Sequence, residues 1–240
     1  MNSTFNTRHS TSERAQARGH FITGTDTGVG KTLIACALLH ALTKAGKRSV
    51  GMKPVAAGAV ATSEGLVNDD VAQLRAASSV PAALRIVNPY CFEPAIAPHI
   101  AAAQAGVAID LAHIARAYAQ LAAIADSVIV EGAGGFCVPL NGHADTADLA
   151  QQFALPIILV VGVRLGCINH ALLTAQAIRA RGLRLAGWVA NCIDAAMPVA
   201  AENIAALAER LNAPLLGTVE FTPRPVALHV ADRLDLSHLD

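Results

Sequence analysis

The chain has little of what marks membrane-spanning or nucleic-acid-binding proteins. Aromatic residues make up 4% of its 240 residues, charged residues 15%, and the formal net charge is zero. A balanced charge gives no reason to expect a nucleic-acid partner or an anionic membrane surface. The apolar runs, such as residues 156–163, are far too short to cross a bilayer. We therefore expect neither nucleic acid nor membrane among the partners.

The cysteines also lack an organised pattern. They stand at positions 36, 91, 137, 167 and 192, an odd number with no Cys-x-x-Cys spacing. This argues against a disulfide framework and a zinc knuckle and favours a reducing compartment, so the expected location is cytoplasmic. Each cysteine is better explained as a small packing residue than as a nucleophile.

The first eighteen residues differ in composition from the rest. Residues 1–18 are rich in Ser, Thr, Asn and Arg and lack the apolar segment of a secretory signal. They have some character of a transit peptide, but we expect a disordered N-terminal extension. Residues 19–240 are long enough for one large domain with a substantial core.

Segments typical of strands and of helices alternate along that domain. Asp110 is expected to cap one helix, Gly182 to end another, and Pro198 to open a third that runs to about Leu211. The expected strands are His20–Gly24, Ser49–Lys53, Ser127–Glu131, Pro156–Val161, Leu185–Asn191 and Leu215–Val219. This alternation predicts a three-layer α/β domain, with a mostly parallel central sheet and helices on both faces.

The most informative stretch follows the first expected strand. It reads Phe21-Ile-Thr-Gly-Thr-Asp-Thr-Gly-Val-Gly-Lys-Thr32, and an apolar helical pattern begins directly after it. This is the layout of a phosphate-binding P-loop, in which backbone N–H groups and a helix N-terminus surround phosphates. Lys31 then reaches the terminal phosphates, and the Thr32 hydroxyl ligates Mg²⁺. An ordinary strand–helix turn would explain the glycines but not the Lys-Thr pair.

The loop departs from the usual P-loop spacing in one respect. Five residues separate Gly24 from Gly30, where the usual pattern has four, and Thr25 occupies the usual glycine position. The preceding strand and the following helix still favour a nucleotide site. We therefore predict a single-domain fold of the P-loop NTPase type.

Other expected strands also end in functional groups, at the sheet edge where α/β proteins bind ligands. Lys53 could present its cation to an anionic substrate or phosphoryl group, or simply be a surface lysine. Glu131 could hold Mg²⁺ or be a solvated glutamate. Asn191 could read a nucleobase edge or bond a nearby turn.

Two further groups of side chains are less informative. Asp69 and Asp70 could supply another oxygen ligand or cap the helix that begins there. His99 and His170 have no second histidine at metal-ligand spacing, so we interpret them as structural or capping residues. Together the residues predict an Mg-ATP-dependent enzyme with an anionic small-molecule substrate.

Several longer motifs resemble those of the dethiobiotin synthetase family. Beside the P-loop, the matching stretches are Met52-Lys-Pro-Val55, Val87-Asn-Pro-Tyr90, Pro98-His-Ile100, Val130-Glu-Gly-Ala-Gly-Gly135, Val160-Val-Gly-Val-Arg-Leu-Gly-Cys-Ile-Asn-His170 and Leu185-Ala-Gly-Trp-Val-Ala-Asn191. The block that ends at His170 is highly specific, and the additional P-loop residue is this family's own variant. The resemblance covers the chain from about residue 20 to about residue 219.

The resemblance implies closure of a ureido ring in biotin biosynthesis. 7,8-Diaminopelargonate takes up CO₂ as a carbamate, ATP phosphorylates the carbamate, and the second amine attacks to expel phosphate and form dethiobiotin. The implied cofactor is Mg²⁺, with ATP and CO₂ as co-substrates. Family members are homodimers in which the partner subunit completes the substrate site.

The resemblance also implies roles for individual residues. Lys53, Lys31 and Thr27 are the expected catalytic residues, and Thr32, Asp70 and Glu131 the expected Mg²⁺ ligands. The implied ATP-binding residues are Gly28, Val29, Gly30, Lys31, Thr32, Leu33, Asp70, Glu131, Gly132, Ala133, Gly134, Asn191, Cys192, Glu220, Phe221 and Thr222. The implied substrate-binding residues are Thr27, Lys53, Ala57, Leu165, Gly166, Cys167 and Asn169, the last four contributed across the dimer.

The chain departs from the family at two places. The family usually has a hydroxyl residue after Lys-Pro-Val-Ala, where this chain has Ala57. It often has a proline-aromatic pair where this chain has Glu220-Phe221. These departures affect one expected substrate hydrogen bond and the expected contacts to the base.

Three other functions fit the sequence less well than ring closure. A ParA/MinD-like switch ATPase carries a signature lysine early in its P-loop, where this chain has the oppositely charged Asp26. A cobyrinate-type amidoligase would need a glutamine amidotransferase domain, which the sequence does not contain. A catalytically silent ATP-binding module would not explain the placement of Lys53 and Glu131.

Overall fold

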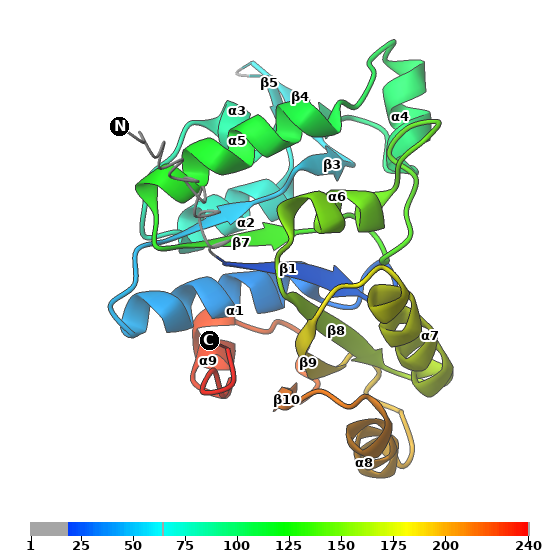
Figure 1. The fold of residues 1–240 in the computed structure, drawn as a ribbon. Coiled ribbons are helices and arrows are strands. Elements are labelled where there is room, and N and C mark those ends of the chain that lie inside the picture. Colours follow the sequence, from blue (N-terminus) through cyan, green and yellow to red (C-terminus); the bar gives the residue numbers. More distant parts are fainter. Residues whose placement is uncertain (1–18, 64, 240) are drawn as a thin grey trace, which may run out of the picture.

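The computed structural model describes residues 19–63 and 65–239 (Figure 1). The extension expected at residues 1–18 lies outside the described residues. Within the described part, no helix is both long enough and apolar enough to span a membrane.

The centre of the molecule is a parallel sheet whose strand order is β10-β9-β8-β1-β7-β2. Its strands are β1 Gly19–Gly24, β2 Ser49–Met52, β7 Ser127–Glu131, β8 Ile157–Val163, β9 Leu185–Cys192 and β10 Leu215–Val219. All six correspond to strands predicted from the sequence. The second is one residue shorter than expected, so Lys53 directly follows β2 and does not end it.

Two small sheets were not predicted. β3 Val55–Ala57 pairs with β6 Tyr90–Phe92 in parallel, and β4 Val60–Thr62 pairs with β5 Gly65–Val67 in antiparallel orientation. Each strand has three residues, too few for a periodic pattern to be recognised in the sequence.

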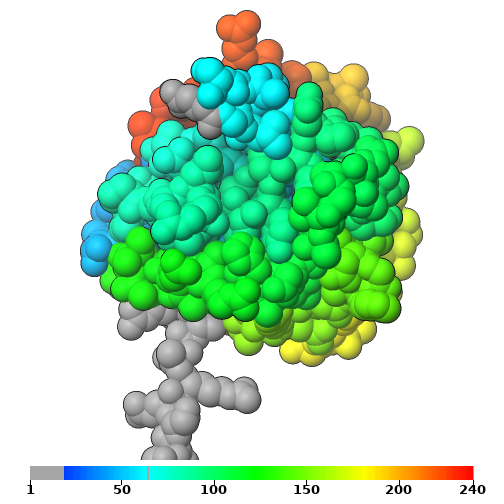
Figure 2. All heavy atoms as spheres, turned by 90° about the horizontal axis from the view of Figure 1, so that it is seen from above, coloured from blue at the N-terminus to red at the C-terminus, as the bar shows by residue number. Residues whose placement is uncertain are grey.

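Helices cover both faces of the central sheet (Figure 1). They are α1 Lys31–Lys44, α2 Asp69–Ala77, α3 Leu84–Val87, α4 Pro98–Gln104, α5 Leu111–Ile124, α6 Thr146–Phe153, α7 Cys167–Ala180, α8 Ala200–Arg210 and α9 Ala227–Ala231. α1 and α9 pack on one face, and α5 to α8 pack on the other. The surface segments from β4 to α5 gather together on the side seen in Figure 2.

The strands pack into two separate cores because successive side chains point to opposite faces of a sheet. Phe21 belongs to the core under α5 to α8, and its neighbour Ile22 to the core under α1 and α9. Ile157 and Ile158 divide in the same way. Strands covered on both faces read as continuous apolar runs, which explains why they were recognisable in the sequence.

Helix boundaries were predicted with mixed success. Asp110 caps α5, with its Oδ1 accepting from Ala112 N at 2.8 Å. Gly182, with φ of 70°, follows the end of α7 as expected. The prediction for Pro198 was wrong, because α8 begins at Ala200 after Val199 adopts a left-handed φ of 51°.

The structure predicts an acid-dependent loss of stability through His20. Burial, reinforced by the positive charge of Arg184, lowers the pKa of this β1 side chain from 6.5 to about 4. Between these pH values the unfolded chain binds a proton that the folded protein excludes. The stabilisation is therefore complete above pH 6.5 and is lost as the pH falls toward 4.

Urea unfolding of the wild type and of His20→Gln from pH 7.5 to 4.5 measures this contribution. The wild type is expected to lose more free energy of unfolding than His20→Gln over that range, and the exposed His143→Gln is expected to follow the wild type. Parallel curves for wild type and His20→Gln would contradict the assignment.

Candidate active site

The loop between β1 and α1 has the backbone conformation that a phosphate-binding loop requires. Gly28 and Gly30 have φ values of 75° and 92°, in the left-handed region that favours glycine. Gly30 is also the N-cap of α1, so the first helical N–H groups point out of the helix end beside it. A side chain at Gly30 would collide with the Asn191 amide, which gives a second reason for a glycine there.

The loop forms one wall of a cavity of about 820 Å³. The lining residues are Asp26, Thr27, Gly28, Gly30, Lys31, Thr32, Lys53, Val55, Ala57, Asp70, Ala95, Ile96, Ala97, Pro98, Glu131, Ala133, Gly134, Gly135 and Val138. The cavity lies beyond the carboxyl ends of β1, β2 and β7, where a parallel sheet is expected to bind ligands. Its lining combines cations, carboxylates and a phosphate-type loop with an apolar wall.

Lys53 lies at the bottom of this cavity between two carboxylates. Its Nζ contacts Glu131 Oε1 at 2.5 Å and Asp70 Oδ2 at 2.9 Å. The Lys53 and Glu131 side chains are 6% and 1% exposed, so this pair is buried. Breaking a buried pair by removing one partner typically costs about 3–5 kcal/mol, because a charge stays behind uncompensated.

The structure decides between some of the roles that the sequence left open for these residues. Buried Lys53 is not a surface lysine, and buried Glu131 is not a solvated glutamate. Asn68, not Asp69 or Asp70, caps α2, with its Oδ1 accepting from Val71 N. Asp70 instead lies in the first turn of α2 and turns its carboxylate to Lys53.

Lys31 lines the same cavity and contacts the phosphate loop itself. Its Nζ donates to Asp26 O at 2.9 Å, and the residue is 6% exposed. Burial lowers the pKa of Lys31 to about 8, although the charge of Glu131 opposes the shift. The side chain is therefore poorly hydrated, and an anion in the cavity would find it an effective partner.

Asp26 is held by an ion pair that was not predicted from the sequence. Its Oδ2 accepts from Arg164 Nη2 at 2.5 Å, and its Oδ1 accepts from Thr27 N at 2.7 Å. Arg164 directly follows β8 and precedes the turn that opens α7. The pair therefore joins the phosphate loop to the Leu165–Asn169 turn.

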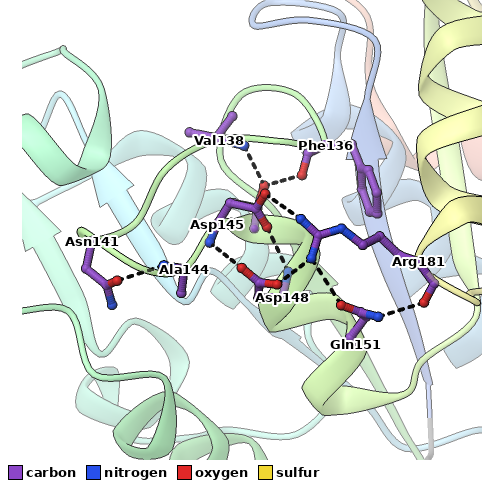
Figure 3. A network of polar contacts seen from close by, with 9 residues as sticks. Phe136, Val138, Asn141, Ala144, Asp145, Asp148, Gln151 and Arg181 are labelled. Carbon is purple, nitrogen blue, oxygen red and sulfur yellow. Dashed lines mark hydrogen bonds and ion pairs between the residues drawn. The ribbon is translucent and has the colours of Figure 1, made fainter.

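The loop after β7 is fixed from outside the cavity by a network of polar contacts (Figure 3). The Thr146 hydroxyl donates to Phe136 O at 2.5 Å and accepts from Val138 N at 3.1 Å. Asp145 and Asp148 form a capping box at the start of α6. Arg181, beyond α7, contacts both carboxylates. The network holds Gly135 and Val138 against the cavity from two helices.

The residues expected to bind ATP divide into two groups. Gly28, Gly30, Lys31, Thr32, Asp70, Glu131, Ala133 and Gly134 line the cavity, whereas Val29, Leu33, Gly132, Asn191, Cys192, Glu220, Phe221 and Thr222 do not. Asn191 donates from Nδ2 to Val29 O at 2.8 Å, the bond to a nearby turn that was one of its two interpretations. Glu220 lies within 3.6 Å of Arg233 on the surface.

The residues expected to bind the substrate divide in the same way. Thr27, Lys53 and Ala57 line the cavity, but Leu165, Gly166, Cys167 and Asn169 do not. Leu165 is 91% exposed, whereas Cys167 is 2% exposed and packs in the core. The turn that carries these residues is therefore not part of the cavity within one subunit.

Sequence reasoning missed the apolar wall of the cavity. Val55, Val138 and the segment 95–98 line it, and Ile96 stays 40% exposed. Val55 and Pro98 fall in the motifs Met52-Lys-Pro-Val55 and Pro98-His-Ile100, but neither side chain is charged, so neither indicated a ligand. Irregular loop residues have no period that reveals which way they face.

The oxygen donors near Lys53 fit a magnesium site that phosphates complete. Thr32 Oγ1 lies 2.9 Å from Glu131 Oε1, and Asp70 joins the same cluster through Lys53. Glu131 Oε2 is buried with no hydrogen-bond partner among the described residues. No group of three or more His, Cys, Asp or Glu in the described part of the chain could hold a metal. The two carboxylates of Glu131 and Asp70 fit the ligand set that Mg²⁺ prefers, which is one or two carboxylates plus phosphate oxygens and water.

The Arg164–Asp26 pair yields a prediction for nucleotide affinity. Arg164→Met leaves the Asp26 carboxylate without its cation beside the phosphate loop, so ADP binding should weaken by about three- to tenfold through repulsion. Isothermal titration of ADP measures the change. Arg116→Met removes a more exposed pair with Asp110, away from the cavity, and should bind ADP like the wild type. An unchanged affinity in Arg164→Met would contradict the role of the pair.

Comparison with solved structures supports the fold. MinD, a cell division protein of Aquifex aeolicus, matches with a TM-score of 0.50 over 86% of this chain and 83% of that one, at 18% identity. The MinC:MinD complex from the same organism matches equally well. At this identity the likeness shows a shared α/β fold and does not extend to function.

Comparison with curated sequences shows the family. A family model described as an AAA domain matches residues 18–226. The ATP-dependent dethiobiotin synthetase BioD of Janthinobacterium sp. (strain Marseille) is 56% identical over 91% of this chain and 94% of its own length. The proteins of the same name from Aromatoleum aromaticum and Pseudomonas aeruginosa (strain UCBPP-PA14) are 59% and 53% identical, over 85% and 88% of this chain and 91% and 94% of theirs. The chain thus belongs to the ATP-dependent dethiobiotin synthetase family and is an ATP-dependent, ligase-type enzyme of biotin biosynthesis.

Proposed function

We propose that this protein closes the ureido ring of dethiobiotin from 7,8-diaminopelargonate, CO₂ and ATP, releasing ADP and phosphate. The observation that carries the proposal is the convergence of Lys31, Lys53 and the phosphate loop on one cavity with an apolar wall. A substrate with an aliphatic chain and a reacting polar end suits such a lining. The family relationship supports the same reaction.

The bond changes balance without a further reactant. One amine of the substrate adds to CO₂ and loses a proton, which gives a carbamate. A carbamate oxygen then attacks the γ-phosphorus of ATP, and ADP leaves. The second amine attacks the carbonyl carbon of the resulting carbamic-phosphoric anhydride, phosphate leaves with the bridging oxygen, and a further proton is released.

The chain would contribute electrostatic stabilisation and positioning to these reaction steps. These two effects supply most of the catalysis in phosphoryl transfer. Lys31 would stabilise the terminal phosphates, and Lys53 would stabilise the carbamate and the moving phosphoryl group. Thr27 would lie near the carbamate. Thr32, Asp70 and Glu131 would hold Mg²⁺, which when bound screens the negative charge of the phosphates.

The ATP-binding residues outside the cavity would meet the nucleoside end of ATP. Asn191 and Cys192 at the end of β9, with the Glu220–Thr222 loop after β10, would form the neighbourhood of the base. The Asn191 amide, now bonded to Val29 O, retains a carbonyl oxygen as an acceptor for an adenine amino group.

A homodimer would complete the substrate site. The Leu165–Asn169 turn does not line its own cavity but exposes Leu165 to 91%, which suits a contact with a second copy of the chain. The turn would thus reach the cavity of the other subunit. Residues 19–240 would form the synthetase domain, 1–18 an N-terminal extension, and the enzyme would act in the cytoplasm.

The direct test is product formation. Purified protein with Mg-ATP, bicarbonate and 7,8-diaminopelargonate should form dethiobiotin and ADP in equal amounts, measured by mass spectrometry and chromatography. Lys44→Met, which loses an exposed pair with Asp232 outside the cavity, should retain wild-type activity. ATP binding without any ring-closed product would refute the proposal.

A further inference from the structure

One lysine contacts the carboxylate oxygen atoms that would coordinate the proposed metal ion. Lys53 Nζ contacts Glu131 Oε1 at 2.5 Å and Asp70 Oδ2 at 2.9 Å. The same Oε1 accepts the Thr32 hydroxyl at 2.9 Å. The three residues assigned to Mg²⁺ are thus connected, directly or through Glu131, to a single ammonium group.

The two carboxylates need a cation. Glu131 is 1% exposed at the end of β7, and an ionised carboxylate at such a position is costly unless it is paired. Burial by itself lowers the pKa of Lys53, but the charges of Glu131 and Asp70 outweigh it, and the net effect is a raised pKa. For Asp70, burial raises the pKa, but Lys53, the Thr32 hydroxyl and Lys31 together outweigh burial, and the net effect is a lowered pKa. Lys53 and Asp70 therefore stabilise each other in their charged forms.

The pairing is incomplete. Among the described residues the Lys53 ammonium is the only cation that bonds the two carboxylates, whereas Lys31 acts on them through its charge alone, and Glu131 Oε2 is buried without a partner among the described residues. A divalent cation would match the charge of the two carboxylates and could also contact this oxygen. The same carboxylates therefore suit a divalent cation better than a lysine, provided that the lysine has another place to lie.

Lys53 has such a place, since it also lines the 820 Å³ cavity. Its unbranched four-carbon stem can turn the ammonium from the carboxylates toward the cavity. A lysine and a divalent cation on the same carboxylates would repel each other at close range. The arrival of one therefore favours departure of the other.

We propose that Lys53 is an internal counter-ion that competes with the divalent cation for Glu131 and Asp70 and is released toward the substrate when the cation binds. The inference rests on the proposed function of the site. It adds an order of events, because Lys53 becomes available to an anionic intermediate only after the metal nucleotide is in place. A permanent structural ion pair is the contrasting explanation.

Competition predicts that removal of Lys53 strengthens metal binding. Lys53→Met should bind Mn²⁺, measured by electron paramagnetic resonance without nucleotide, at least about tenfold more tightly than the wild type. Lys31→Met removes the same charge from the same cavity, but the Lys31 ammonium bonds a backbone carbonyl and neither carboxylate. Its gain in Mn²⁺ affinity should be clearly smaller. Unchanged or weakened Mn²⁺ binding in Lys53→Met, or an equal gain in both variants, would overturn the proposal.

A measurement on the wild type covers the case in which Lys53→Met does not fold. Reductive methylation followed by peptide mass spectrometry reports how accessible each lysine amine is. Mg²⁺, at a concentration that displaces bound Mn²⁺, should raise methylation of Lys53 severalfold and leave that of exposed Lys44 unchanged. Constant methylation of Lys53 would show a permanent pair and reject the competition.

These outcomes are independent of the ring-closure assay. A wild type that forms dethiobiotin but shows no competition keeps the proposed function and loses this inference. A wild type that shows competition but forms no product loses the proposed function alone.

Discussion

The ion pair between Lys53 and Glu131 is the constraint on which the site depends. A carboxylate that is 1% exposed at a strand end requires a cation, and the 2.5 Å contact supplies one. Because β2 and β7 are adjacent parallel strands, residues at their carboxyl ends lie side by side. Thr32 in the first turn of α1 bonds Glu131, and Asp70 in the first turn of α2 bonds Lys53. The sheet thus concentrates charge at one point, and the surrounding loops enclose it.

The phosphate loop and the loop after β7 are held in place by different contacts. The phosphate loop is fixed by its glycines, by Asn191 and by the Asp26–Arg164 pair. The loop after β7 is fixed from α6 and by Arg181. The MinD likeness concerns the sheet and helices alone, whereas the synthetase relatives match the chain at 51–59% identity. A shared fold positions strand ends, and the residues on them decide the chemistry.

The sequence predicted the parts of the structure that follow a period or a known local geometry. The six central strands are continuous apolar runs, and Lys53, Glu131 and the phosphate loop could be found because strand ends bind ligands. Arg164, the Asn68 cap and the apolar wall at 95–98 were missed, because their roles depend on contacts between segments distant in the chain. The prediction that Pro198 opens a helix was wrong, because a proline is tolerated in the first turn of a helix but does not have to lie there.

In the proposed function, the clustered charges serve one event, the transfer of a phosphoryl group to an oxygen derived from CO₂. Turnover with ¹⁸O-labelled bicarbonate, corrected for exchange with water, tests this most directly. One labelled oxygen should appear in the released phosphate and one in the ureido carbonyl of dethiobiotin, both read by mass spectrometry. Labelled dethiobiotin with unlabelled phosphate would show that ATP activates some other group and would contradict the account.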